Sequence, residues 1–411
     1  MDTPRHFHPH YDAVIVGARC AGAATAMLLA RAGMKVLAID RQAYGSDTMS
    51  THALMRTGVL QLKRWGLLPA VMAAGTPEIR ATTFHYGCET LRLSIKPEYG
   101  VEYLCAPRRT VLDRILVDSA RSASADVRHG VALSRLQIDS KGRVVAASLR
   151  DADGNSTTVR SDIVIGADGR QSTVAALVKA GTYLNGQSTS GYVYGYFEDL
   201  ERYGYHWHFA DNVAAGVIPT NHRQHCVFVS VPGTAFPATF HGNVEGAFRQ
   251  VLAANSPHLS DDVSRARLVG RLRGFAGAPG HLRQSHGPGW ALVGDAGYFK
   301  DPLTAHGITD ALRDAELLAR AILDGRALEA YQRERDVLSV PLFHETEAIA
   351  SFRWNLDEIK TLHASLSASM HAECEYMAGL PAPVHREPQI RSATSYRNAA
   401  LASEPSYFPC S

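Results

Sequence analysis

A glycine turn, a helix and an acid follow one another near the start of the chain. The stretch VIVGARCAGAATAMLLARAGMKVLAIDR begins at Val14, and its pattern predicts a strand, a turn, a helix and a second strand. Gly17 suits a tight turn that leaves free N–H groups and a positive helix end for a diphosphate. Gly22 permits close helix–strand packing, and Asp40 ends the second strand, where an acid binds ribose hydroxyls. Residues 12–40 therefore predict a site for an ADP-containing cofactor.

Arg19 stands where the dinucleotide-binding pattern has its middle glycine. A guanidinium group beside a diphosphate donates paired, charge-assisted hydrogen bonds. The alternative is an arginine that points to solvent. We interpret Arg19 as a residue that faces the cofactor.

Two later apolar strands also end in an acid. IVIGADGRQS ends its strand at Asp168, and WALVGDAGYFKDPLTAHGITDA ends its strand at Asp295 before a helix near Gly307. In this order and spacing, the three segments resemble the para-hydroxybenzoate hydroxylase-type flavoprotein family over roughly residues 11–345. The stretch SDTMSTHALMRTGVLQLKRWGLL is similar to the geranylgeranyl-reductase-like members of these flavoproteins. The resemblance implies FAD as the cofactor and NAD(P)H as a co-substrate.

The resemblance also implies which residues contact FAD. Those placed at the ADP part of the cofactor are Gly17, Arg19, Gly22, Asp40, Arg41 and, near adenine, Leu133. Arg109, in the stretch RTVLD, would contact the phosphate or ribityl region, and Asp295 would bind the ribityl hydroxyls. Asp168 lies in the segment that is near both FAD and NAD(P)H. No separate NAD(P)H-binding domain is predicted. The glycine-rich stretch GFAGAPG is predicted to be a loop because it contains Pro279.

Gly307 and Ile308 are expected to offer backbone N–H groups to the flavin pyrimidine. This part of the resemblance has an independent physical reason. A reduced flavin carries negative charge at its pyrimidine edge, and a helix N-terminus stabilises such a charge.

The periodicity divides the chain into an α/β part and an inserted antiparallel sheet. A Rossmann-like FAD-binding domain is predicted to be discontinuous, with a substrate domain inserted and a helical segment at the C-terminus. The predicted ranges are 11–80, 105–180 and 266–330 for the FAD-binding domain, 81–104 and 181–265 for the substrate domain, 331–380 for the C-terminal helices and 381–411 for a tail.

The inserted sheet is rich in aromatic residues. Tyr203, Tyr205, Trp207 and Phe209 alternate along one strand, so they are expected to share one face. Such a face is most often core, but Tyr205 and Trp207 are also candidates for the wall of a substrate site. His206 and His208 fall on the opposite face. Because the sequence pairs no third ligand with them, no metal site is predicted.

His52 is the candidate general base. It lies in the segment that would run beside the flavin ring, and an imidazole suits proton transfer near neutral pH. A histidine that only starts a helix is the alternative.

Composition narrows the function further. Lys and Arg total 42 against 40 Asp and Glu, which argues against nucleic acid as a partner. No apolar run is long enough to cross a bilayer and no secretory signal is evident, so membrane insertion is not expected. The six cysteines form no close pairs and are expected to be buried, reduced thiols of a cytoplasmic protein.

The resemblance implies an NAD(P)H-consuming monooxygenase. It would use O2, through a flavin C4a-hydroperoxide, to insert one oxygen atom into a small aromatic or polycyclic substrate. The alternatives are a C=C reductase of the geranylgeranyl-reductase type, a flavin halogenase and an FAD-binding protein without catalysis. The halogenase is disfavoured because the chain lacks a Trp-x-Trp-x-Ile-Pro stretch.

Overall fold

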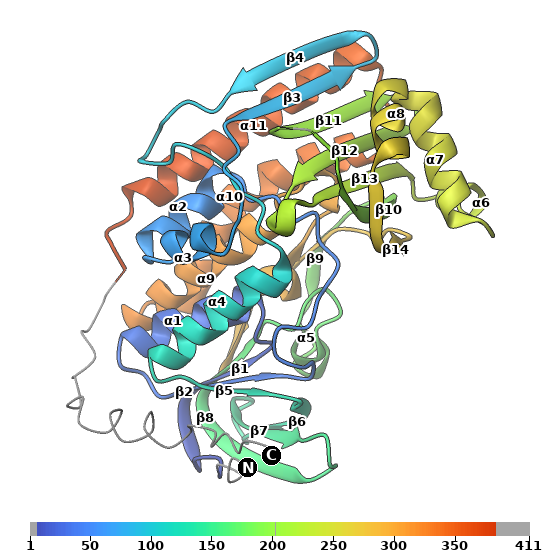
Figure 1. Ribbon diagram of the computed structural model, residues 1–411. Helices are drawn as coiled ribbons and strands as arrows, with labels where there is room; N and C mark the ends of the chain where they lie inside the picture. Colours follow the sequence, from blue (N-terminus) through green and yellow to red (C-terminus); the bar gives the residue numbers. More distant parts are fainter. Residues whose placement is uncertain (1–5, 202, 384–411) are drawn as a thin grey trace, which may run out of the picture.

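The computed structural model describes residues 6–201 and 203–383. The first of its sheets is mixed, with parallel strands at its centre (Figure 1). The strand order is β16-β17-β8-β1-β2-β5, and β7 joins β6 to β8. Strand β1 lies in parallel between β2 and β8, as the predicted strand–helix–strand unit requires. The strands are β1 (His10–Val16), β2 (Val36–Asp40), β5 (Asp126–His129), β6 (Ala132–Ile138), β7 (Val144–Arg150), β8 (Ser156–Gly166), β16 (His286–Gly287) and β17 (Trp290–Leu292).

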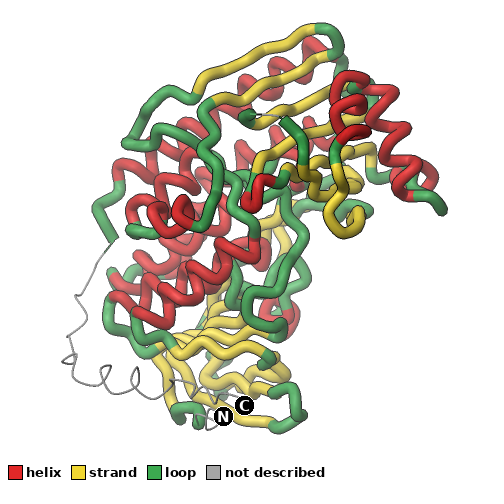
Figure 2. Tube along the Cα trace, in the orientation of Figure 1, coloured by secondary structure: helices red, strands yellow, loops and turns green. Residues whose placement is uncertain are grey.

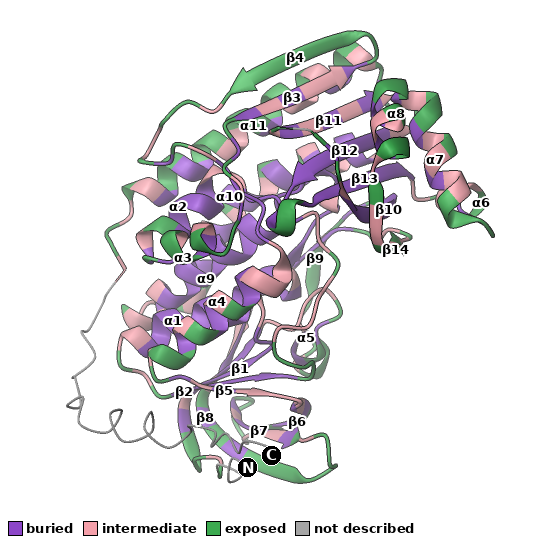
Figure 3. Ribbon diagram, in the orientation of Figure 1, coloured by how far each residue is buried: buried purple, intermediate pink, exposed green. Residues whose placement is uncertain are grey.

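Helices cover one face of this sheet. α1 (Cys20–Arg31) packs against both α4 (Arg109–Ser122) and α9 (Gly307–Leu323), and all three cover the sheet. The other face is covered by β6, β7 and the short helix α5 (Thr173–Leu177). The parallel strands are therefore buried on both faces, as Figure 3 shows, which accounts for their continuous apolar sequences.

A second sheet lies above the first and is mostly antiparallel. Its order is β14-β10-β13-β12-β11-β3-β4, and only β11 and β3 run parallel to each other. Its strands are β3 (Ala81–Tyr86), β4 (Glu89–Ser94), β10 (Ser190–Glu198), β11 (Tyr205–Ala210), β12 (Val213–Pro219), β13 (His225–Pro232) and β14 (Arg267–Phe275). Because β14 pairs with β10, this sheet extends through Phe275, although the sequence placed residues from 266 onward in the FAD-binding domain.

The two faces of the second sheet meet different helices. The inner face carries the tyrosines of β10 together with Tyr205, Trp207 and Phe209, all buried. The outer face of β10, β12 and β13 packs against α7 (Val244–Asn255) and α8 (Pro257–Arg265), next to α6 (Phe236–Thr239). One expectation for this sheet is wrong. Tyr203 precedes β11 and is 85% exposed, because the alternation starts only at Tyr205.

Two long helices follow the last strands. α10 (Leu328–Ala350) and α11 (Leu356–Gly379) pack together and bury apolar side chains against the inner face of the second sheet. The helical conformation ends between them, where Phe352 has a φ of 54°. A capping box formed by Asn355 and Glu358 begins α11. Most of the predicted tail, residues 384–411, lies outside the described residues.

Smaller elements complete the fold (Figure 2). They are the helices α2 (Arg56–Arg64) and α3 (Leu68–Ala73), the 3-10 turns η1 (Asn221–Arg223), η2 (Gly294–Ala296) and η3 (Pro302–Thr304), and a small sheet of β9 (Thr182–Asn185), β15 (His281–Arg283) and β18 (Tyr298–Phe299).

The described residues bear on two predictions made from composition, one on membrane-spanning segments and one on the cysteines. Among the described helices, none combines the length and apolar composition needed to cross a membrane. Of the described cysteines, Cys20, Cys105, Cys226 and Cys374 are buried as expected, but Cys88 is exposed. Cys88 follows Gly87 in the turn between β3 and the edge strand β4, which leaves its side chain exposed. Cys410 lies outside the described residues.

Candidate cofactor and active site

The turn before α1 has no room for side chains at two positions. Gly17 has a φ of 100°, and a Cβ on it would lie 2.3 Å from the carbonyl oxygen of Ala167. A Cβ on Gly22 would lie 1.7 Å from the carbonyl oxygen of Gly17. The turn therefore brings β1, the end of β8 and the start of α1 into backbone contact, which is the geometry that a diphosphate site at a helix N-terminus needs.

Gly17→Ala is expected to destabilise the protein by about 1–3 kcal/mol and to lower the FAD content of the purified protein. The new Cβ would press on a backbone carbonyl and require a left-handed φ of a residue that disfavours it. Thermal unfolding and the flavin absorbance measure both effects. Gly181→Ala is the control, because a Cβ on Gly181 meets nothing within 4 Å and its φ is not left-handed. Equal effects of the two substitutions would refute this account of the turn.

Asp40 and Arg19 border a narrow pocket beside this turn. The Asp40 carboxylate accepts hydrogen bonds from the backbone N–H groups of Ala18 (3.0 Å) and Gln42 (2.8 Å). Arg19 donates to the hydroxyl of Ser46 (3.0 Å) and to Asp113 (3.3 Å). Both residues line the pocket, so both are within reach of a ligand there. Their contacts with ADP stay a prediction.

Arg109 is held by an acid that sequence reasoning did not single out. Its guanidinium group makes two hydrogen bonds, of 2.9 and 3.1 Å, to the Asp113 carboxylate one turn further along α4. Asp113 also accepts from Arg19 and from the Cys20 thiol. Burial raises the pKa of Cys20, so this thiol stays protonated and unreactive. The spacing of Arg109 and Asp113 in RTVLD was the available signal.

Asp295 is the acid whose surroundings best fit an absent ligand. It is half-buried, in η2, and no hydrogen bond or ion pair joins its carboxylate to another residue in 6–201 or 203–383. Burial, with the charge of Asp310, raises its pKa to about 6, against the effect of Arg109. A carboxylate without a protein partner is available to accept hydrogen bonds from a ligand, and hydroxyl donors such as those of a ribityl chain suit it.

The start of α9 lies open nearby. A Cβ on Gly307 would meet nothing within 4 Å, and Gly307 is exposed. The side chain of His306, the N-cap residue of α9, makes no capping hydrogen bond. The Thr309 hydroxyl accepts from the Met55 N–H (3.2 Å), which holds the segment after His52 against the first turn of α9. The backbone N–H groups of Gly307 and Ile308 are thus at a free helix N-terminus, as a flavin pyrimidine site requires. Their role in binding stays a prediction.

Three other predicted cofactor residues have different surroundings. The Asp168 carboxylate accepts from the Ser172 hydroxyl (2.5 Å) and from the Thr173 N–H (2.6 Å) at the start of α5. Leu133 is buried in the core between β6 and the parallel strands, so only its backbone is available to adenine. Arg41 is exposed. None of these placements tests the predicted contacts.

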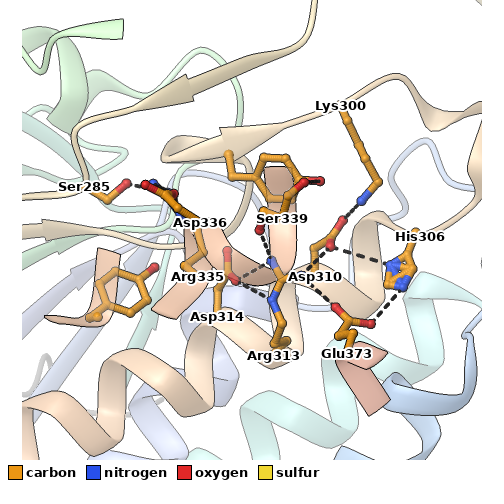
Figure 4. Close-up of polar contacts among 12 residues, drawn as sticks. Ser285, Lys300, His306, Asp310, Arg313, Asp314, Arg335, Asp336, Ser339 and Glu373 are labelled. Atoms are coloured by element: carbon orange, nitrogen blue, oxygen red, sulfur yellow. Dashed lines mark hydrogen bonds and ion pairs between the residues drawn. The ribbon is translucent and has the colours of Figure 1, made fainter. Parts of the chain in front are cut away.

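A buried charged network lies behind the start of α9 (Figure 4). Arg313, on α9, donates to Asp310 (3.0 Å), to Asp314 (2.7 Å), to Ser339 of α10 (2.7 Å) and to Glu373 of α11 (2.6 Å). Lys300 also donates to Asp310. The network therefore ties α9, which carries the predicted flavin contacts, to both C-terminal helices.

His306 joins this network immediately before α9. Its Nε2 lies 3.0 Å from a Glu373 oxygen and its Nδ1 lies 3.5 Å from an Asp310 oxygen. Burial lowers the pKa of His306 to about 3 and raises the pKa of Glu373 to about 7. Both shifts favour a pair in which the His306 imidazole is neutral and the Glu373 carboxyl group takes up a proton more readily than a free glutamate does.

A second polar cluster lies on the inner face of the second sheet. His52 is fully buried with a φ of 66°, and its Nε2 lies 2.5 Å from the Tyr196 hydroxyl. Arg108 stacks on the Tyr196 ring at 3.5 Å from its centroid and donates to Asp47 (3.2 Å). Arg273 donates to the same carboxylate (3.0 Å). Burial, then the charges of the arginines, lowers the pKa of His52 well below its usual value.

This cluster could not be predicted from the sequence alone. Tyr196, Arg108, Arg273 and Asp47 come from four separate segments, and only the folded sheet places them beside His52. His52 itself is held in the left-handed region ahead of α2, rather than at the helix start. Tyr205 and Trp207 lie on the same face and are buried, with the Trp207 indole donating to Thr82 (3.0 Å). Their predicted contact with substrate is not tested by this packing.

Comparison with known sequences decides the family. A family model described as "FAD binding domain" matches residues 10–339. The chain belongs to this family of FAD-dependent oxidoreductases. FAD is accordingly its cofactor, and the unpartnered Asp295, the open start of α9 and the glycine turn fit that cofactor.

Individual relatives carry out several reactions. The chain is 26% identical over 366 residues to a tryptophan 2-halogenase of Chondromyces crocatus, a match that covers 82% of this chain and 68% of the relative. It is 29% identical over 330 residues to digeranylgeranylglycerophospholipid reductase 1 of Methanopyrus kandleri, covering 74% and 77%. The flavoprotein family thus includes halogenase and reductase relatives.

Among solved structures, the fold matches PqsL of P. aeruginosa in complex with 2-aminobenzoylacetate. The TM-score is 0.72 at 20% identity, and the match covers 86% of this chain and all of that one (100%). This similarity confirms the predicted fold: an FAD-binding α/β unit with an inserted, mostly antiparallel sheet.

Proposed function

We propose that this protein is an NAD(P)H-dependent monooxygenase that acts on a small aromatic substrate with a polar substituent. In the overall reaction, NAD(P)H supplies two electrons, one atom of O2 enters the substrate and the other leaves as water. Bound FAD supplies the redox and oxygen-activating chemistry. The chain's own residues bind and orient the substrate, exclude water and handle one proton.

The observation that carries this proposal is the cluster around His52. The buried Nδ1 of His52 has no hydrogen-bond partner in the part of the chain that the structure describes, while Arg273 is the polar neighbour of the buried Tyr194 hydroxyl. Both lie in an aromatic face with Tyr192 and Tyr196. Buried polar atoms are rarely left without a partner, so we place a hydroxyl or amino group of an aromatic substrate at the Nδ1 of His52.

The neighbouring charges define the roles of these groups. Because His52 is neutral at neutral pH, it can accept a proton from a substrate hydroxyl. The Tyr196 hydroxyl fixes the orientation of the imidazole ring. Arg108 and Arg273 lie beside the site and share the single carboxylate of Asp47, so their remaining positive charge favours the deprotonated substrate.

Measurement of NAD(P)H oxidation tests the proposal. Purified protein is assayed with a panel of phenols, anilines and isoprenoid alkenes, with and without oxygen. We expect oxidation that an aromatic compound stimulates and that requires O2. No stimulation by any aromatic compound would contradict the proposal, and so would turnover without oxygen that saturates an alkene.

One observation favours a second candidate function. The relative from Methanopyrus kandleri is a digeranylgeranylglycerophospholipid reductase and is matched over most of both chains. The alkene arm of the same assay detects this activity.

His52→Ala is expected to lower kcat by about 100-fold or more while FAD stays bound, because the substitution removes the proton acceptor but no predicted cofactor contact. Steady-state kinetics and the flavin absorbance measure both quantities. His363→Ala is a matched control. His363 also forms a hydrogen bond with a tyrosine hydroxyl on this face, since its Nδ1 lies 2.9 Å from the hydroxyl oxygen of Tyr86. This tyrosine is on β3, not on β10 beside His52. If both variants lose activity equally, His52 has no specific role.

A further inference from the structure

Three histidines meet on the outer face of the second sheet. His206 and His208 lie two residues apart on β11, so they share one face. β3 runs parallel beside β11 in a register that places His85 opposite His208. One ligand nitrogen from each of the three residues lies within 4.8 Å of the other two. The sheet thus supplies the third ligand that the sequence did not pair with His206 and His208.

We propose that His85, His206 and His208 bind one divalent transition metal ion of the Zn2+ class, with water as the fourth ligand. Neutral imidazole nitrogen is a preferred ligand of zinc, copper and nickel. Three histidines with one open position form a known type of zinc coordination. The three rings are half-buried, so the fourth position can be reached from solvent.

The distances suit a tetrahedral ion. His85 Nε2 lies 3.2 Å from His206 Nδ1. Two nitrogen ligands with bonds of 2.0–2.1 Å at a tetrahedral angle are about 3.3–3.4 Å apart. The His208 ring stacks on that of His85, with 4.1 Å between the centroids and 9° between the planes. Binding therefore requires the His208 ring to turn, while the other two ligand atoms already have the needed separation.

The outer nitrogens of two of these rings have oxygen partners. His206 Nε2 lies 3.1 Å from the carbonyl oxygen of Tyr203, and His85 Nδ1 lies 3.2 Å from the Thr90 hydroxyl. A carbonyl oxygen only accepts, so His206 Nε2 carries the proton and its Nδ1 presents a lone pair. Histidine ligands of metals commonly donate their second N–H to such a partner, which fixes the tautomer and the ring orientation.

In two other groups of residues with metal-ligand spacing, the carboxylates already bind other donors. In the group of His306, Asp310 and Glu373, the two carboxylates already bind Arg313, and Asp310 also binds Lys300. In the group of His10, Asp12 and Asp162, the Asp12 carboxylate accepts from the Lys35 N–H.

The site would fasten the edge hairpin to the sheet. β3 and β4 form the edge, and β4 is exposed along its whole length, as Figure 3 shows. A metal bound across β3 and β11 adds a link between this hairpin and the centre of the sheet. Because the histidines lie on the face opposite Trp207 and Tyr205, the proposed ion does not contact the predicted FAD or substrate site.

Zinc binding by the untagged, flavin-loaded protein tests the proposal. After treatment with a chelator, the protein is titrated with Zn2+ by calorimetry, and its thermal midpoint is measured with and without Zn2+. We expect one equivalent bound per chain and a higher midpoint with zinc. His85→Asn and His208→Asn should each lose the equivalent and the rise in midpoint, while their FAD content stays unchanged.

The N-terminal histidines supply the control. His6, His8 and His10 also bind metals in principle, so a variant with asparagine at all three should still bind one equivalent of Zn2+. Binding that is lost in this variant but kept in His85→Asn and His208→Asn would overturn the proposal. So would an absence of zinc binding by the parent protein.

Discussion

Asp295→Ala is expected to yield a folded protein with almost no bound FAD. A hydrogen bond to a charged group contributes about 1.5–3 kcal/mol, so the loss of one such bond raises the Kd for FAD by about 10–150-fold, and two ribityl hydroxyls would lose more. Flavin absorbance of the purified protein and titration of the FAD-free protein measure the effect. The carboxylate has no partner of its own in the structure, so the fold should tolerate its removal.

The control for this substitution lies at the far end of α9. Asp324 is exposed at the C-terminus of α9, and Asp324→Ala should keep FAD fully bound. If Asp295→Ala also purifies with full FAD content, the placement of the ribityl chain beside η2 is wrong.

The pH dependence of FAD binding should depend on the same carboxylate. Its pKa of about 6 in the FAD-free protein means that the ionised, accepting form predominates above pH 6. FAD affinity should therefore be constant above that pH and fall below it, by at most about tenfold per pH unit for a single ionisation. In Asp295→Asn, which cannot ionise, this fall should be absent.

Arg313→Met is expected to lower the free energy of unfolding by about 3–5 kcal/mol. The substitution removes one member of a fully buried ion network and leaves buried carboxylates without their cation. Chemical denaturation followed by circular dichroism measures the change. Because the network ties α9 to α10 and α11, FAD binding should weaken in parallel.

A surface arginine provides the matched comparison. Arg333 pairs with Glu329 one turn earlier on α10, and both side chains are more than 60% exposed, at 67% and 63%. Arg333→Met should change stability by no more than about 0.5 kcal/mol. Equal losses in Arg313→Met and Arg333→Met would show that burial of the network is not what stabilises the fold.

The sequence predicts those parts of the protein whose signals are local. The turn at Gly17, the acid at Asp40 and the strand that ends at Asp295 each lie in one continuous stretch with a fixed spacing. Their backbone geometry follows from that spacing, because strand, turn and helix are set by neighbours in the chain. For the same reason the α/β class, the inserted sheet and the C-terminal helices were predictable.

The remaining parts of the site depend on contacts between distant segments. Arg108 meets Tyr196, and both meet His52, only after β10 is placed against the segment before α2. The partners of His306 come from α9 and α11. His85 joins His206 and His208 through a parallel strand pairing that no short-range pattern indicates. The sheet order is set by tertiary packing, so single-sequence spacing does not reveal these pairs.

Turnover under isotopically labelled O2 tests the proposed reaction most directly. The protein is incubated with NAD(P)H, oxygen-18 gas and the aromatic compound that best stimulates NAD(P)H oxidation, and the product is analysed by mass spectrometry. A monooxygenase predicts a product that carries a single labelled oxygen atom. A product without the label, or one that has gained only two hydrogen atoms, would contradict the proposed function.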